Sequence, residues 1–269
     1  MATSASKQCL VNGVPKDSVS VLDRGLLYGD GVFETIRFVR GRSPLWARHI
    51  DRLKRSLRVL GIPAPDPAQL LSECKQLIAK QPDAVIRITL TRGQGGQAYF
   101  PPGQAEPNRI LTLRSPAQPK PEIDMIRSTV TLNSTSVLAG IKHLNRLEQV
   151  LIARECQLHG AQEALVSDQE GWLVEGLSGN IVLHHGGQLI APGPHPAAVW
   201  GVGLDWLRAL LKCQLSERPF HRDELQPDDS IWVINSVQGV RLVHQLDGHL
   251  LPPSTALDPA ITAWNTLFE

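Results

Sequence analysis

A lysine inside an apolar run is the first candidate for covalent chemistry in this chain. Lys142 lies in the segment 137–148, among Leu138, Ile141 and Leu144. Partial burial disfavours the charged ammonium and lowers the pKa of a lysine, so that its neutral amine can attack a carbonyl carbon. A lysine that extends its amine from a strand end into water fits this segment equally well. The surrounding residues must decide between the two.

The residues after the lysine predict a helix. Asn145 followed by Glu148 matches an N-cap with its capping-box partner. Apolar residues then recur at helical spacing, at Leu144, Leu147 and Leu151. We therefore expect the lysine to end an extended segment directly before a helix that begins at Asn145.

A glycine-punctuated loop, 23–31, leads into a strand predicted for 32–39. Because side chains alternate along a strand, Phe33, Thr35 and Arg37 share one face. This mixture is unusual for a core and natural for the wall of a site. A β-branched residue chosen for strand propensity is the alternative interpretation of Thr35.

Two helices and a second strand come next. The apolar spacing predicts a helix over 47–60, with Arg52 beside its apolar stripe, and a helix over 67–80. The run 84–91 is rich in β-branched residues and predicts a strand. The segment 92–99 contains three glycines and predicts a loop.

These segments resemble the class IV aminotransferase family, the pyridoxal-phosphate enzymes of fold type IV. Gly-Ile-Lys-His-Leu-Asn-Arg-Leu at 140–147 is similar to the lysine segment of the aminodeoxychorismate lyase branch. Further motifs follow in family order: Asp-Arg-Gly at 23–25, Tyr-Gly-Asp-Gly-x-Phe-Glu at 28–34, His-x-x-Arg-Leu at 49–53 and Glu-x-x-x-x-Asn at 175–180. The resemblance covers nearly the whole chain.

The resemblance implies a binding set for pyridoxal 5′-phosphate. Lys142 would bond covalently to the cofactor, and the planar Arg52 guanidinium would bind its phosphate. Glu175 would meet the pyridine nitrogen and keep it protonated, and Asn180 completes that signature. Without the resemblance, Arg52 and Glu175 would be interpreted as solvated residues.

Two turns are implied to contact the same phosphate. Gly201 and Val202 would donate backbone amides at the start of a helix predicted from residue 204. Ser236 and Val237 would supply a hydroxyl and an amide where a strand ends. Each turn is ordinary by itself, and their order in the chain gives them weight.

The resemblance also implies substrate contacts. Lys142 would act as the base and Thr35 as the acid that delivers a proton. The substrate-binding candidates are Tyr28, Arg37, Gln97 and Tyr99. Gln97 departs from the family, because relatives often carry an arginine there for a substrate carboxylate, and the sequence leaves open what replaces it. Further departures are Val182, Ala191, Leu204 and Asp205.

Composition excludes several function classes. The 269 residues are 42% hydrophobic with a net charge of +1 and no run of like charges, which indicates a soluble protein without nucleic-acid or membrane partners. The cysteines Cys9, Cys74, Cys156 and Cys213 are far apart, so we expect buried thiols, no metal and a reducing compartment. No signal sequence is evident at the amino terminus, and we expect a cytoplasmic protein. His184 and His185 precede two glycines and predict an exposed hairpin end.

The resemblance implies the fold class α+β, a two-domain fold similar to D-amino acid aminotransferase, and the bounds of its domains follow from the sequence. We expect a smaller amino-terminal α/β sandwich over 1–114 and a linker over the proline-rich 115–121. A larger domain over 122–269 would carry a β-barrel-like sheet and the lysine. Asn-Gly at 12–13 and Asp-Gly at 247–248 predict hairpins, and 259–268 a terminal helix.

The resemblance implies a homodimeric lyase that eliminates pyruvate from aminodeoxychorismate and gives 4-aminobenzoate for folate biosynthesis. An aminodeoxychorismate synthase would supply its substrate. A class IV transaminase acting on D-amino or branched-chain amino acids is the alternative enzyme, because the fold does not choose between them. A non-catalytic binding protein is disfavoured, since Lys142, Arg52 and Glu175 are all present.

Overall fold

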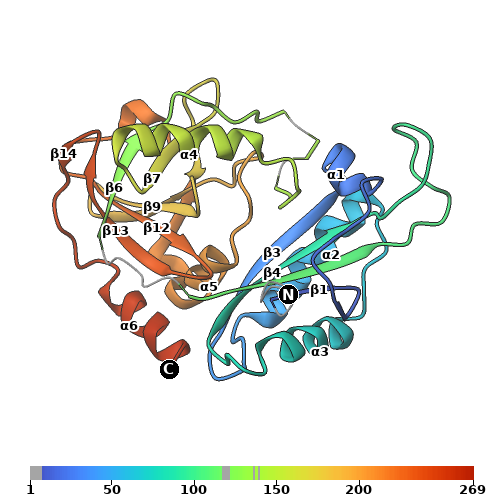
Figure 1. The fold of residues 1–269 in the computed structure, drawn as a ribbon. Coiled ribbons are helices and arrows are strands. Elements are labelled where there is room, and N and C mark those ends of the chain that lie inside the picture. Colours follow the sequence, from blue (N-terminus) through green and yellow to red (C-terminus); the bar gives the residue numbers. More distant parts are fainter. Residues whose placement is uncertain (1–7, 117–121, 136, 139) are drawn as a thin grey trace. The chain divides into compact units, whose positions relative to one another are not determined.

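The computed structural model describes residues 8–116, 122–135, 137–138 and 140–269, and the chain divides into two compact units (Figure 1). Unit 1 comprises the chain through Ala117 together with Lys142–Asn145, and unit 2 comprises 118–141 and 146–269. Part of the predicted linker, 117–121, lies outside the described residues.

Unit 1 is built on one antiparallel sheet with the strand order β2-β1-β5-β4-β3. The strands are β1 (Cys9–Val11), β2 (Val14–Pro15), β3 (Gly31–Phe38), β4 (Ala84–Thr91) and β5 (Asn108–Arg114). The predicted hairpin at 12–13 is confirmed: Asn12 and Gly13 have φ values of 54° and 81°, as a tight primed turn requires.

Three helices accompany this sheet: α1 (Arg24–Tyr28), α2 (Trp46–Leu60) and α3 (Pro67–Ile78). Helix α2 packs on β3 and buries the predicted stripe of Ile50, Leu53 and Leu57. It also buries His49 and Arg52, although Arg52 was predicted to lie beside the stripe. Asp66 caps α3 by accepting from the amide of Ala68.

The lysine segment packs against β3 and is part of unit 1. The amide of Phe33 donates to the Lys142 carbonyl at 2.9 Å, and the amide of Leu144 donates to the Gly31 carbonyl at 3.0 Å. Strand β3 uses its other side for β4. The short segment therefore extends the edge of the unit 1 sheet.

The predicted cap at Asn145 is wrong. Helix α4 (Leu147–His159) begins two residues later, with Arg146 at the N-cap position and no side-chain cap. The Asn145 side chain instead donates to the Gly29 carbonyl at 3.3 Å. A Cβ at Gly29 would lie 2.3 Å from Asn145 Oδ1, so glycine permits this close approach.

Unit 2 contains a nine-stranded sheet in the order β11-β10-β9-β12-β13-β6-β7-β8, with β14 also paired to β13. Its strands are β6 (Glu122–Arg127), β7 (Glu163–Ser167), β8 (Leu173–Gly176), β9 (Asn180–His185), β10 (Gln188–Pro192), β11 (Leu215–Arg218), β12 (Ser230–Asn235), β13 (Gly239–Leu246) and β14 (His249–Leu250). Strand β8, at one end of the path, packs against β9 and β10, so the sheet curls. The predicted barrel-like sheet is confirmed.

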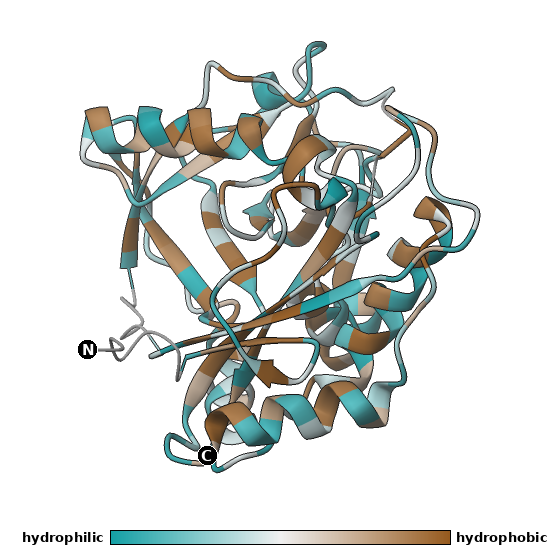
Figure 2. Ribbon diagram, turned by 45° about the vertical axis from the view of Figure 1, so that its right-hand side comes forward, coloured by the Kyte–Doolittle hydropathy of each residue, from teal (hydrophilic) through white to brown (hydrophobic). Residues whose placement is uncertain are grey.

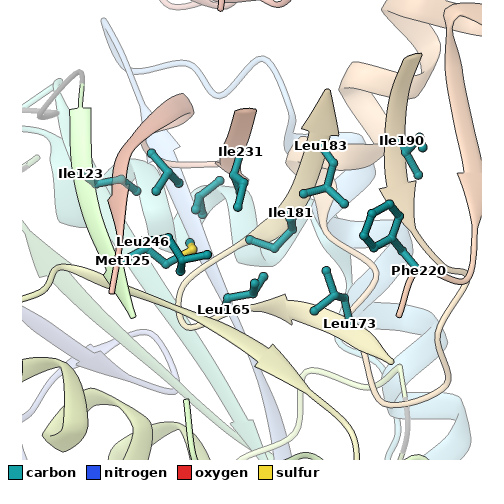
Figure 3. Close-up of a cluster of buried hydrophobic side chains, with 12 residues drawn as sticks. Ile123, Met125, Leu165, Leu173, Ile181, Leu183, Ile190, Phe220, Ile231 and Leu246 are labelled. Atoms are coloured by element: carbon teal, nitrogen blue, oxygen red, sulfur yellow. The ribbon is translucent and has the colours of Figure 1, made fainter. Parts of the chain in front are cut away.

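Strands β9 and β12 are buried on both faces, which explains their continuous apolar sequences. Figure 3 shows one cluster, which includes Ile181, Leu183 and Ile231 together with Phe220. The alternate residues, including Val182 and Trp232, belong to a second cluster. Helices α5 (Val202–Leu211) and α6 (Asp258–Leu267) contribute Leu207 and Ala260 to that second cluster.

The hairpin predictions in unit 2 are confirmed. Strands β9 and β10 pair His185 with Gln188 around two glycines, and β13 and β14 pair Leu246 with His249.

Among the described residues no group of side chains could hold a metal ion. Cys213 is exposed, so the expectation of buried thiols is wrong at that position. Brown apolar and teal polar residues alternate along the helices (Figure 2), and no helix of the described chain is both long and apolar enough to cross a membrane.

Candidate active site

One face of the unit 1 sheet brings an amine, a guanidinium and a hydroxyl together. Lys142 Nζ lies 4.6 Å from the centre of the Phe33 ring, and the guanidinium carbon of Arg87 lies 3.7 Å from the same centre. Arg87 is the cross-strand partner of Thr35, so the two residues point to the same face. Arg37 is two residues farther along that face and half-buried. Burial lowers the pKa of Arg37, and nearby Asp83 opposes that shift.

A buried ion-pair network lies on the opposite face of β3. Glu34 is 1% exposed, and Arg52 donates from Nε to Oε1 at 2.7 Å and from Nη2 to Oε2 at 2.5 Å. His49 Nδ1 lies 2.7 Å from Oε2. Burial raises the pKa of the Glu34 carboxyl, but the charge and hydrogen bonds of Arg52 and the hydrogen bond from His49 outweigh burial and lower this pKa to about 2. Glu34 therefore fixes the Arg52 guanidinium in one orientation.

His49 is the third member of this network, through its contact with Glu34. Burial lowers its pKa, and although Glu34 favours the charged ring, the positive charges of Arg52 and Lys142 add to the lowering. The contact of its Nδ1 with the Glu34 carboxylate holds the ring in place. Lys142 therefore acts electrostatically on the buried network.

The remaining unit 1 candidates lie on α1 and on the loop after β4. Tyr28 ends α1, and its ring centre lies 5.5 Å from that of Tyr99. Gln97 is exposed and pairs through its backbone with Phe100. Tyr99 is 83% exposed. The two tyrosine rings thus lie side by side.

In unit 2, the predicted signature pair binds the backbone amide and the backbone carbonyl of one residue, Val199. Glu175 Oε2 accepts from the amide of Val199 at 2.9 Å, and Asn180 Nδ2 donates to the carbonyl of the same residue at 3.0 Å. Glu175 and Asn180 are each 7% exposed. The pair therefore positions the segment that leads directly into α5.

The start of α5 lies against the Asn180 side chain and the backbone of Asn235. Gly201 is the N-cap, so the helix begins at Val202, two residues earlier than predicted. A Cβ at Gly201 would lie 1.8 Å from Asn180 Oδ1, and a Cβ at Gly203 would lie 2.8 Å from the carbonyl carbon of Asn235. The absence of a side chain at Gly203 lets the helix N-terminus approach the end of β12, and its absence at Gly201 makes room for the Asn180 side chain.

The second predicted phosphate turn follows β12. Asn235 Oδ1 accepts from the amides of Val237 at 3.0 Å and of Gln238 at 2.8 Å, which forms an Asx turn around Ser236. The Val237 amide, predicted to contact phosphate, thus donates to a side chain. The two predicted turns nevertheless lie next to each other, through the contact of Gly203 with Asn235.

Two departures from the family pattern line one pocket of unit 2. Ala191 and Leu204 face it together with Asn180 and Trp200. Arg208 lies at its edge, 5.0 Å from the Trp200 ring centre. These departures therefore change a pocket wall next to the α5 N-terminus.

The sequence did not predict that Arg87 lies beside Phe33 or that Glu34 and His49 form a buried network with Arg52. For Arg87 a signal was present, because an arginine inside a β-rich strand is as unusual as Arg37. Its facing partner depends on strand register, which the sequence does not give. Glu34 and His49 belong to the motifs at 28–34 and 49–53, but the sequence alone assigned neither of them a contact.

A model of the amino-transferase class IV family matches residues 31–246. The chain belongs to this family, in agreement with its fold.

Within this family, the chain is similar to both lyases and aminotransferases. The chain is 30% identical over 243 residues to the aminodeoxychorismate lyase of Vibrio harveyi, which covers 86% of this chain and 88% of that protein. It is 31% identical over 244 residues to a putative branched-chain-amino-acid aminotransferase of Methanocaldococcus jannaschii, covering 87% and 84%. The crystal structure of 4-amino-4-deoxychorismate lyase from Pseudomonas aeruginosa superimposes with a TM-score of 0.88 and 35% identity, covering 96% and 98%. The predicted two-domain fold of type IV is thereby confirmed.

Proposed function

We propose that this protein is a pyridoxal-phosphate-dependent aminodeoxychorismate lyase, which releases pyruvate from 4-amino-4-deoxychorismate and leaves 4-aminobenzoate, a folate precursor. The observation that carries the proposal is the unit 1 face on which the Lys142 amine and the Arg87 guanidinium flank Phe33, next to Thr35. Similarity to the lyases of Vibrio harveyi and Pseudomonas aeruginosa, at 30% and 35% identity, supports it.

The residues present fit the parts of the cofactor. The N-terminus of α5, which begins after Gly201, suits a phosphate, as does the hydroxyl of Ser236. Glu175 offers a carboxylate to a pyridine nitrogen, and Lys142 offers an amine to an aldehyde. Arg52 is the proposed guanidinium donor to the phosphate. When bound, pyridoxal phosphate supplies a ring that accepts electrons from the substrate carbon next to nitrogen.

In the proposed reaction Lys142 acts as the base. Its neutral amine removes the proton from the substrate carbon that bears nitrogen. The bond from the substrate ring to the enolpyruvyl oxygen then breaks. The Thr35 hydroxyl donates a proton to the methylene carbon of the leaving group, which gives pyruvate. Loss of the ring proton and the ether makes the ring aromatic.

Replacing Thr35 with valine tests the proposed acid. Valine keeps the β-branched shape and removes the hydroxyl, so we expect turnover to fall by about 10² to 10⁴ while the bound cofactor keeps its absorption. Thr35→Ser, which restores a hydroxyl, should recover part of the rate. Pyruvate release in single-turnover mixtures measures the step. A valine variant with the wild-type rate would remove Thr35 from the mechanism.

Arg87 is our candidate for the carboxylate-binding role that Gln97 does not fill. Its guanidinium shares the sheet face of Thr35, and a guanidinium binds a carboxylate with two parallel hydrogen bonds. We expect Arg87→Gln to raise KM for aminodeoxychorismate about 10- to 100-fold with a smaller change in kcat. Arg87→Lys keeps the positive charge but loses the planar guanidinium, so its KM should lie between those of the wild type and Arg87→Gln. Equal KM values in all three proteins would contradict the assignment.

A class IV transaminase is the second candidate function. The chain is 23% identical to a bifunctional aminodeoxychorismate lyase and D-amino acid transaminase of Mycobacterium tuberculosis, so one scaffold carries both activities in that protein. The discriminating experiment adds D-alanine or leucine without a keto acid and follows conversion of the cofactor to its pyridoxamine form. The lyase proposal predicts slow conversion relative to pyruvate release from aminodeoxychorismate. The reverse ratio would make the protein a transaminase.

We also propose that the protein functions as a homodimer. Exposed apolar side chains on α1 and α4, including Leu26, Leu27, Leu147 and Val150, are available for contact with a second copy. Analytical ultracentrifugation should give the mass of two chains.

A further inference from the structure

Arg24 gathers the loop 95–100 around one buried guanidinium. The residue is 5% exposed, and its Nη1 and Nη2 atoms donate to the carbonyls of Ala98 at 2.9 Å and Tyr99 at 3.2 Å. Longer contacts reach the carbonyls of Gly95 at 3.4 Å and Phe100 at 3.5 Å. A single side chain thus binds four carbonyls of one loop.

The other donor of the guanidinium fixes its position. Arg24 Nε donates to Asp30 at 2.9 Å, and the Arg24 amide donates to the Gly93 carbonyl at 2.8 Å. The guanidinium carbon also lies 4.9 Å from the ring centre of Tyr28. Arg24 is therefore held by α1 and the β3 entry while it binds the loop.

The loop contributes little apolar burial of its own. Tyr99 is 83% and Phe100 is 77% exposed. Gly95, Gly96 and Ala98 have positive φ values of 103°, 82° and 50°, which costs conformational free energy at the alanine. The loop closes on itself through reciprocal backbone hydrogen bonds between Gln97 and Phe100. Such a segment needs polar anchoring, and the Arg24 fork supplies it.

We propose that Arg24 is a positioning residue whose guanidinium fixes the loop 95–100 and thereby sets the affinity for the substrate. Gln97 and Tyr99 lie on this loop, and Tyr99 reaches the Tyr28 ring beside Arg24. The proposal rests on the proposed function only for its substrate effect. The conformational effect on the loop stands by itself.

The substitution Arg24→Lys tests whether the planar guanidinium, and not the positive charge alone, holds the loop. Arg24→Lys keeps a cation near Asp30 but offers a point charge in place of five planar donors, so it cannot bind several carbonyls at once. We expect amides 95–100 to exchange with deuterium at least about tenfold faster in this variant and KM for aminodeoxychorismate to rise about tenfold. The kcat value and the absorption of the bound cofactor should change less.

Arg92→Lys is the matched control. Arg92 binds the same carboxylate, from Nε to Asp30 Oδ2 at 2.8 Å, but its other donors bind Leu60 at 2.6 Å and Gly61 at 3.0 Å, at the end of α2. This variant should alter stability without raising KM. A KM increase in Arg92→Lys equal to that in Arg24→Lys would reduce the effect to general destabilisation and overturn the proposal.

A second loop variant covers the case in which Arg24→Lys does not fold. Gly96→Ala would place a Cβ 2.1 Å from the Phe100 carbonyl oxygen and disturb the loop without touching Arg24. It should reproduce both the faster exchange and the higher KM. Unchanged exchange in Arg24→Lys would show that Arg24 does not hold the loop, and faster exchange with unchanged KM would show that the loop does not set affinity. Absence of lyase turnover in the wild type would instead reject the proposed function and leave the exchange result intact.

Discussion

Replacing Lys142 with alanine should lower lyase turnover by more than about 10⁴-fold, because the change removes both the covalent attachment of the cofactor and the base. Lys142→Arg should be equally inactive: it keeps a cation beside Phe33 but has no neutral amine. The check on attachment is borohydride reduction followed by mass spectrometry, which should place the cofactor mass on the peptide that contains residue 142.

The matched control for this prediction is the exposed residue Lys80. Lys80→Ala should retain turnover and the labelled 142 peptide. Cofactor mass on another peptide of the wild-type protein, or turnover in Lys142→Ala near the wild-type level, would refute the role of Lys142.

The second large effect concerns stability. Glu34→Gln should lower the free energy of unfolding by about 3–5 kcal/mol, because it leaves the Arg52 guanidinium buried without its counter-charge. Urea unfolding of the cofactor-free protein measures the difference. The exposed pair of Arg222 and Asp223 gives the control, since Asp223→Asn removes a charge that water already screens and should change stability little. Equal midpoints for wild type and Glu34→Gln would contradict the network.

The same network predicts a pH dependence. The pKa of Glu34 falls from its ordinary value of 4.5 to about 2 on folding, which corresponds to about 3 kcal/mol. Because the folded pKa is the lower one, this contribution is complete above pH 4.5 and is lost as the pH falls from there through about 2. Wild-type stability should therefore decline more steeply than that of Glu34→Gln over this range.

Alternation and helical spacing predicted much of unit 1. The strand expected over 84–91 has those bounds, and the helix expected over 47–60 begins one residue earlier. These elements bury regular apolar sets, so their local pattern agrees with their tertiary role. Strands β9 and β12 carry continuous apolar runs because both of their faces are covered.

The predictions failed at residues whose contacts come from a distant part of the sequence. Asn145 has the pattern of a cap, but its side chain binds the Gly29 carbonyl, and the helix begins after it. The burial of Arg52 and His49 depends on Glu34, which comes from a different element. Helical spacing separates polar from apolar positions, but it does not show which charged side chains pair with each other inside a core. The facing of Arg87 and Thr35 likewise follows from register alone.

The most direct test of the lyase proposal is an absorption spectrum of the purified protein with pyridoxal phosphate, recorded before and after addition of enzymatically generated aminodeoxychorismate. Pyruvate is followed in the same cuvette by a coupled assay, and 4-aminobenzoate by chromatography. We expect a band from lysine-bound cofactor and one pyruvate released for each 4-aminobenzoate formed. A band without pyruvate would contradict the lyase activity, and no band after incubation with the cofactor would contradict the covalent role of Lys142.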